Sequence, residues 1–428
     1  MQLKIMSSLV AATGALLGAA PGPSIAAEKV DNWNFDTSVA YYGESDRIQD
    51  ASAKMLAIRT SNGSVLTLRA ALDTLTGASA NGAVPSNSIQ TFTSPSGGES
   101  YRVNPGEIPL DPTFQDTRYA VSANWLRPLG SRFEVDLGGS VSKESDYLHT
   151  GVNARINRDF GQRNTRLTFG VAFAADSNDP EGGTPLPFTM MLPETDDDDD
   201  DNPGKTGSES KTVTDLFLGV TQVFGKRTIG QFNYSMSASS GYLNDPYKVL
   251  SVLDPVTADP APGADELNLY LYESRPDKRT KHSLFGMIKH KFGRQVVDGS
   301  YRYMTDDWGI VSHTLDLHWR SPIGTGWYIQ PHLRFYTQTA ADLYRPYLLD
   351  GDPLPDHASA DYRLGDLDGT TLGLKVGRSL GGGREYSARV EYYQQSGTSP
   401  PGASFGALEE FDLFPSVDAL IVQLGFRF

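Results

Sequence analysis

Stretches in which apolar and polar side chains alternate recur from one end of this chain to the other. In one of them Phe133, Val135 and Leu137 share one face, and Glu134 and Asp136 occupy the other. Similar stretches cover residues 166–173, 232–237 and 327–336. A tilted strand needs about 9–11 residues to cross a bilayer, with its apolar face toward lipid and its polar face toward water. The pattern therefore predicts transmembrane β strands, since a soluble sandwich has shorter strands with turns every ~8–12 residues.

The C-terminal segment repeats this alternation most regularly. Five residues form its apolar face: Leu420, Val422, Leu424, Phe426 and Phe428. A last strand that ends on phenylalanine resembles the recognition signal of bacterial outer-membrane barrels. We therefore expect these five residues to face lipid and to be recognised by the barrel-assembly machinery.

The connections between the strands fall into two classes that are expected to alternate strictly. Short, mostly glycine-containing turns lie at residues 61–63, 129–131, 161–164, 224–226, 292–294, 323–326 and 381–383. Longer polar loops lie between them, notably at residues 77–113, 178–211, 241–279, 341–360 and 396–415. Short periplasmic turns and long extracellular loops are typical of outer-membrane barrels. The sequence thus predicts an all-β, antiparallel, up-and-down barrel of about 16 strands. Fourteen strands is the alternative, because alternation is poor over residues 44–60.

The N-terminus and the composition place this barrel in the cell outer membrane. Lys4 precedes a short apolar stretch at residues 9–20, and small residues near Ala27 offer a cleavage site, so residues 1–27 are predicted to be a signal peptide. Residues 28–428 would then form the barrel. The chain contains no cysteine, which excludes disulfides, thiolate metal sites and cysteine nucleophiles. Its net charge of -15 argues against nucleic acid as a partner. The expected surroundings are outer-membrane lipid and lipopolysaccharide, and the oligomeric state is left open.

Six segments of the mature chain are similar to those of a known family. They are LTGASANGA (75–83), PLDPTF (109–114), SGYLNDPYK (240–248), ESRPDKR (273–279), YRYMTDDW (301–308) and SADYRL (359–364). The sequence resembles a family of proteobacterial outer-membrane barrels known only as a domain of unknown function. The resemblance implies a barrel, and proteins like it tend to be encoded near flavin-transferase and thioredoxin-like partners. It transfers no catalytic residue.

Charged residues on the polar faces of the C-terminal strands are the main candidate site. Alternation predicts that ten of them line the lumen: Asp298, Arg302, Asp316, His318, Arg320, His332, Arg334, Glu385, Arg389 and Glu391. They would either form a charged constriction that selects a solute or pair with one another and stiffen the wall. Because both signs are mixed, no ion selectivity is predicted.

No metal site or cofactor is predicted. His313 and His318 point to opposite faces of one strand, and His282 and His290 lie roughly 26 Å apart along another. An acidic run that includes Asp196, Asp198 and Asp200 offers only weak ligands, since it lacks the spacing of a calcium loop. A solvated, self-repelling loop is the simpler interpretation of that run.

Three functions remain in play. The first is a channel or passive transport barrel for a small solute, in which loop 77–113 either folds inward to narrow the pore or stays outside. The second is a scaffold that binds partners, and the gene neighbours of the similar family imply periplasmic redox proteins as those partners. The third, an outer-membrane hydrolase, is disfavoured because no Ser–His–acid set stands out in the sequence.

Overall fold

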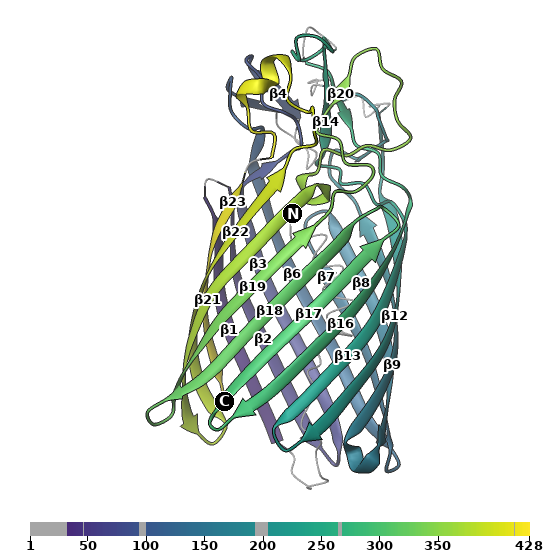
Figure 1. Cartoon of the computed structure of the whole chain (residues 1–428). Helices are drawn as coiled ribbons and strands as arrows, with labels where there is room; N and C mark the ends of the chain where they lie inside the picture. Colours follow the sequence, from purple (N-terminus) through teal and green to yellow (C-terminus); the bar gives the residue numbers. More distant parts are fainter. Residues whose placement is uncertain (1–31, 46, 94–99, 193–203, 264–267, 415) are drawn as a thin grey trace.

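Sixteen strands of the described part of the chain form a closed barrel (Figure 1). This computed structural model describes residues 32–45, 47–93, 100–192, 204–263, 268–414 and 416–428. The predicted signal peptide and the aspartate run lie outside the described residues. The barrel strands are β1 (Asn32–Glu44), β2 (Ile48–Ser61), β3 (Ser64–Ala80), β6 (Leu110–Leu129), β7 (Phe133–Lys143), β8 (Tyr147–Phe160), β9 (Thr165–Asn178), β12 (Glu209–Gly225), β13 (Thr228–Gly241), β16 (Lys278–Phe292), β17 (Gln295–Asp306), β18 (Val311–Ile323), β19 (Trp327–Gln338), β21 (Asp366–Gly381), β22 (Arg384–Thr398) and β23 (Val417–Arg427).

Each strand pairs antiparallel with the barrel strand before it, and the first and last strands close the ring. At the seam, Phe35 and Phe428 exchange two backbone hydrogen bonds of 2.8 and 2.9 Å. The predicted all-β barrel of about 16 strands is therefore confirmed, and the 14-strand alternative is wrong. The weakly alternating residues 48–61 form β2 because β1 and β3 supply backbone partners along both of its edges.

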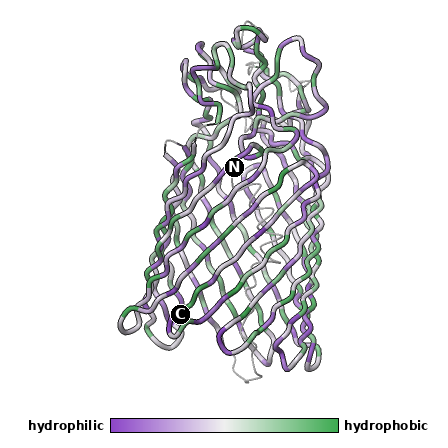
Figure 2. The backbone as a smooth tube through the Cα atoms, in the orientation of Figure 1, coloured by the Kyte–Doolittle hydropathy of each residue, from purple (hydrophilic) through white to green (hydrophobic). Residues whose placement is uncertain are grey.

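The outer face of the barrel is apolar. Val121 and Val152 are 61% and 63% exposed, as are many other large side chains at alternate positions. Aromatic side chains gather where the short turns lie, namely Trp33, Phe133, Phe160, Phe224, Phe292, Trp327 and Phe428. Such a girdle marks the edge of the lipid in outer-membrane barrels. Figure 2 shows apolar and polar residues interleaved along each strand. Among the described residues, no helix has the length and apolar character to span a membrane.

The two ends of the barrel differ. At one end, called the turn end, the strands are joined by short turns such as Asn62-Gly63, where φ is 50° and 79°. Positive φ at both positions is what a two-residue hairpin requires, and Asn-Gly supplies it at little cost. At the other end, called the loop end, the connections are longer but less regular than predicted. Three connections at this end are short, namely residues 45–47, 144–146 and 307–310. The predicted strict alternation of short turns and long loops is therefore wrong.

The short connection at residues 307–310 is stabilised by a side chain of the strand before it. Asp306 accepts hydrogen bonds from the backbone N–H groups of Trp308 and Ile310 at 3.1 and 2.9 Å, which fixes a tight turn. Trp308 and Ile310 then pack against Leu343 and Phe414 of neighbouring loops. The long loops thus cover this part of the rim.

The five long loops, residues 81–109, 179–208, 242–277, 339–365 and 399–416, build a cap over the loop end (Figure 1). The cap contains three small sheets, made by β4 (Gln90–Thr93) with β5 (Ser100–Val103), by β10 (Thr184–Pro185) with β11 (Lys205–Thr206), and by β15 (Tyr270–Tyr272), β14 (Val249–Leu253) and β20 (Leu348–Leu349). It has its own apolar cores.

Two of these cores show how the loops interlock. One joins Phe92, Met191 and Tyr270 from three different loops. Another joins Val84, Leu253 and Leu408, again from three loops. The described residues of loop 81–109 therefore belong to the packed cap.

Candidate functional site

A cavity of about 630 Å³ lies against the barrel wall, and the charged residues in its lining are at positions that face the lumen. Six basic residues line it, namely Lys54, Arg69, Arg118, Lys375, Arg389 and Arg427, whereas the acidic residues in its lining are Asp36 and Glu385. Asp73 lies beneath this surface with no exposed area, 2.5 Å from Arg118 and 3.8 Å from Lys54. The surface that water or a solute meets in this cavity is therefore more basic than acidic, although the whole chain is acidic.

The sequence candidates on β18, β19 and β22 meet across the concave side of the wall. Arg320 Nη2 of β18 lies 3.3 Å from Glu385 Oε2 of β22, although β19 and β21 separate these two strands. Such a contact is possible only inside the barrel. Arg320 also stacks 3.6 Å from the centre of the Tyr328 ring. Arg389 lies 3.4 Å from Glu391 on the same strand.

Three other candidates do not join this group. Asp298 pairs with Lys289 at 2.6 Å, and Arg302 stacks on Phe285 at 5.2 Å. Arg334 lies opposite Asp316 in the register of β18 and β19. These three residues thus have partners on neighbouring strands.

Four of the candidates form a compact cluster. His318 Nδ1 and His332 Nε2 lie 3.0 and 3.2 Å from the two carboxylate oxygens of Asp316. The second nitrogen of His332 lies 2.8 Å from Glu391 Oε1. The rings of His318 and His332 are parallel, with centroids 4.2 Å apart. All four were predicted from sequence to face the lumen. The contact between the two histidines was not predicted, because it depends on the strand register, which places His318 opposite His332.

Luminal residues of the N-terminal half were missed. Arg118 binds Asp73, and Arg155 binds Asp136 in a short contact. The same two-residue alternation that marked the C-terminal strands could have identified them, since Trp125 and Leu137 mark the outer faces of β6 and β7.

A serine, a histidine and an aspartate also meet in this half. Ser140 Oγ lies 3.2 Å from His149 Nε2, and His149 Nδ1 lies 2.7 Å from Asp176 Oδ1. A hydrolase also needs donors aimed at the developing oxyanion. Ser140 lies inside β7, which is paired along both edges, so the nearby backbone N–H groups are engaged in the sheet. We interpret these three residues as a hydrogen-bonded chain that ties β7, β8 and β9 together.

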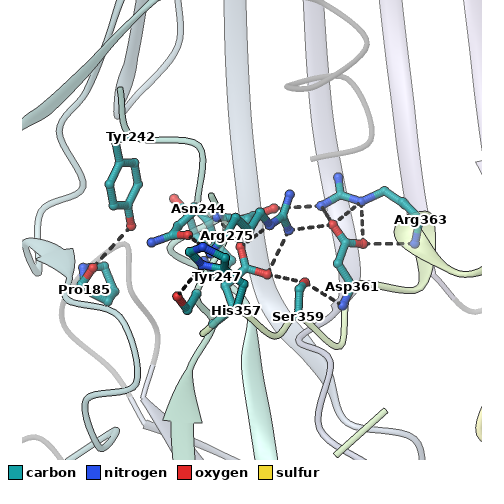
Figure 3. A network of polar contacts seen from close by, with 12 residues as sticks. Pro185, Tyr242, Asn244, Tyr247, Arg275, His357, Ser359, Asp361 and Arg363 are labelled. Carbon is teal, nitrogen blue, oxygen red and sulfur yellow. Dashed lines mark hydrogen bonds and ion pairs between the residues drawn. The ribbon is translucent and has the colours of Figure 1, made fainter. Parts of the chain in front are cut away.

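Beneath the cap, a buried network of charges spans the mouth of the barrel (Figure 3). Arg275 lies 2.6 Å from Glu273 and 2.9 Å from Asp361. Arg363 lies 2.5 Å from Asp361 and 2.7 Å from Asp245. Ser359 donates a short hydrogen bond to Glu273. With Lys248, which is also buried, the network contains three acidic and three basic side chains.

The network is anchored at three separated points of the rim. Lys248 donates a short hydrogen bond to the carbonyl of Ala80, the last residue of β3. Asp245 follows the end of β13, and Arg363 precedes β21. These are the third, ninth and fourteenth strands of the closed order, so the anchors are spaced almost evenly around the ring. The network therefore crosses the mouth instead of following its edge.

Electrostatics favours the charged forms of Asp361 and Asp245, but not that of Glu273. Burial alone would raise the pKa of Asp361, but Arg363 and Arg275 outweigh it and keep that pKa below its usual range. Burial would likewise raise the pKa of Asp245, but Arg363 and Lys248 outweigh it and lower that pKa. For Glu273 burial prevails over the attraction of Arg275, and its pKa is raised.

Several solved structures resemble this chain in fold but share little of its sequence. Solved structures with a similar course include a monoaromatic hydrocarbon channel, CymD, with 8% identity, coverage of 93% of this chain and 88% of that chain, and a TM-score of 0.40. The siderophore receptor PirA from Acinetobacter baumannii shares 8% identity, with coverage of 91% and 57% and a TM-score of 0.41. OccAB1 from the same organism shares 9% identity, with coverage of 95% and 99% and a TM-score of 0.39. At these values the similarities carry no conclusion about function.

No curated protein matches the sequence. A family model described as "Protein of unknown function (DUF3570)" matches residues 6–428, nearly the whole chain, as the resemblance of its six segments predicted. The chain therefore belongs to the DUF3570 family of outer-membrane-type β-barrels.

Proposed function

We propose that this protein is an outer-membrane channel for small solutes with a preference for anions. The observation that carries the proposal is the luminal cavity of about 630 Å³, with six basic side chains in its lining against two acidic ones. Basic side chains along a pore attract anions and repel cations, and low-dielectric walls strengthen their field. The sequence alone predicted no ion selectivity, because its luminal candidates carry both signs of charge.

The cap supports a gated channel. Its buried charge network crosses the mouth, and its apolar cores tie all five long loops together. A solute can pass only when the cap loops separate. We therefore assign the cap the role of a closed gate at the outer end.

A scaffold is the second candidate, and the same cap favours it. A packed surface of five interlocked loops could bind a partner without any passage through the barrel. The two candidates differ in what happens when the cap is removed, because only a channel then conducts ions.

Ion selectivity tests the channel directly. We expect anion-selective reversal potentials in a salt gradient when the open barrel is measured in planar bilayers. To open the mouth, short Gly-Ser linkers replace both residues 82–108 and residues 243–276, because the second replacement also removes Asp245, Lys248, Glu273 and Arg275 of the charge network. Replacing both Arg69 and Arg389 by Gln should move the reversal potential toward the cation side, and Asp36→Asn should move it the opposite way. A correctly folded open barrel whose reversal potential is unchanged by both sets of substitutions would overturn the anion preference. One that does not conduct would overturn the channel.

A further inference from the structure

We propose that Asp316, His318 and His332 bind a divalent transition-metal ion on the luminal wall, with Glu391 orienting His332. This site goes beyond the proposed channel function and does not depend on it. One ligand atom can be taken from each of the three side chains so that all lie within 4.8 Å of one another.

The distances suit a metal ion. In a tetrahedral zinc site with metal–ligand distances of about 2.0–2.1 Å, neighbouring ligand atoms lie ~3.3 Å apart. His318 Nδ1 lies 3.0 Å from Asp316 Oδ1 and His332 Nε2 lies 3.2 Å from Asp316 Oδ2, so each imidazole nitrogen has a ligand-like distance to a different oxygen of this carboxylate. Strands β18 and β19 place these ligands side by side, since His318 is directly opposite His332 in the register. The two rings are stacked in parallel, so one of them would rotate about its side-chain bonds to bring both nitrogens onto one ion.

The hydrogen bonding of His332 also supports a metal ion at this site. Its Nδ1 lies 2.8 Å from Glu391 and its Nε2 lies 3.2 Å from Asp316. A neutral imidazole carries one proton and can donate to one of these carboxylates only. If that proton faces Glu391, the Nε2 lone pair faces Asp316, and a metal ion bound between them would replace the second proton of a doubly protonated ring. A histidine that donates its other N–H to a carboxylate is the usual arrangement around metal sites.

The chemistry of the ligands selects the class of metal. Two imidazole nitrogens and one carboxylate suit zinc, cobalt or nickel, whereas calcium and magnesium prefer oxygen ligands alone. Arg389, 3.4 Å from Glu391, and Arg334, opposite Asp316, add positive charge and disfavour a cation held by charge alone. His318 is 31% exposed and Asp316 25%, so the site opens to the lumen. Water or an anionic solute can complete the coordination there.

The test measures metal uptake by the purified full-length barrel in detergent. A tag without histidine is used, and Asp196 to Asp201 are replaced by Asn to remove competing oxygen ligands. After chelation and dialysis, we expect one equivalent of Co²⁺ per chain, with visible absorption bands, and competition by Zn²⁺. His318→Gln and His332→Gln should each abolish the bands. Glu391→Gln should weaken Zn²⁺ binding by about 10- to 100-fold.

Outward-facing histidines provide the matched control, since His282→Gln and His290→Gln should bind Co²⁺ as the parent does. Heat-dependent gel mobility verifies that each variant is folded. If His332→Gln does not fold, His318→Gln decides alone, because its side chain is more exposed. A folded parent that takes up no Co²⁺ or Zn²⁺ would overturn the proposal and leave His332 as a doubly protonated ion-pair partner. Equal uptake by folded His318→Gln would overturn it as well.

Discussion

At the scale of single residues, alternation predicts which way a side chain points but not which side chain it meets. Asp316, His318, His332 and Glu391 were all assigned to the lumen from sequence, and they contact one another there. Their pairing depends on strand register, which sequence periodicity does not supply. The charge network of the cap was out of reach for the same reason, since Arg275 and Asp361 are 86 residues apart.

The buried network should be sensitive to the loss of one charge. Asp361 has no exposed area, and its replacement by Asn removes the one carboxylate that Arg275 and Arg363 share, so that Arg275 keeps Glu273 and Arg363 keeps Asp245. Removing one partner of a buried ion pair typically costs about 3–5 kcal/mol. We expect Asp361→Asn to increase hydrogen exchange across residues 245–253, with the barrel strands unchanged. Asp254→Asn, the same substitution at a more exposed position of the cap, should leave exchange as it is, and an equal response from both variants would contradict this interpretation.

At the scale of elements, strands with strong alternation were predicted well. Residues 133–142 became β7 and residues 327–336 became most of β19. Strand β2 shows that pairing can override a weak pattern, because its neighbours on both sides supply backbone partners. The small sheets of the cap were missed, since β14 pairs with β20 across nearly a hundred residues of intervening chain.

The last strand should be required for assembly. Phe428 stacks on Phe35 at 5.2 Å, and Phe426 stacks on Tyr386 at 4.5 Å, both on the lipid-facing side of the seam. Deletion of Phe428, or Phe426→Asp, should deplete the protein from the outer membrane. A lipid-facing charge costs ~2–4 kcal/mol at the midplane and less near the edge, so loss of recognition should dominate. Gln423→Asp puts the same charge on the luminal face and should leave membrane levels normal. Normal levels of all three variants would contradict the assignment.

At the scale of the whole molecule, the two ends of the barrel should face different compartments. We predict that the cap lies outside the cell and the turn end in the periplasm, because long loops are extracellular in outer-membrane barrels. An epitope tag inserted within residues 196–201 should therefore be reached by antibody on intact cells. A tag in the turn at residues 381–383 should be reached only after the cells are permeabilised. The opposite labelling would reverse the orientation.

The cap should also control conductance, and the absence of cysteine from the chain allows a reversible lock. Ser274 and Ala358 lie on different cap loops and exchange two backbone hydrogen bonds of 2.9 Å. Residues paired in this way have Cα atoms about 5.5 Å apart, a separation that a disulfide can bridge. Replacing both by Cys should therefore tie the two loops together under oxidising conditions.

The channel and scaffold proposals predict different currents for this set of variants. If the cap is a gate, the wild type should open in small steps, the oxidised Cys pair should stay closed, and reduction should restore the openings. Replacing residues 82–108 by a short linker removes Val84, Phe92 and Tyr101 from two cap cores, so it should give larger and more persistent currents. A scaffold would stay sealed in every form, because its barrel has no continuous path. Folded barrels that conduct neither with the short linker nor after reduction would end the channel proposal and leave the cap as a binding surface.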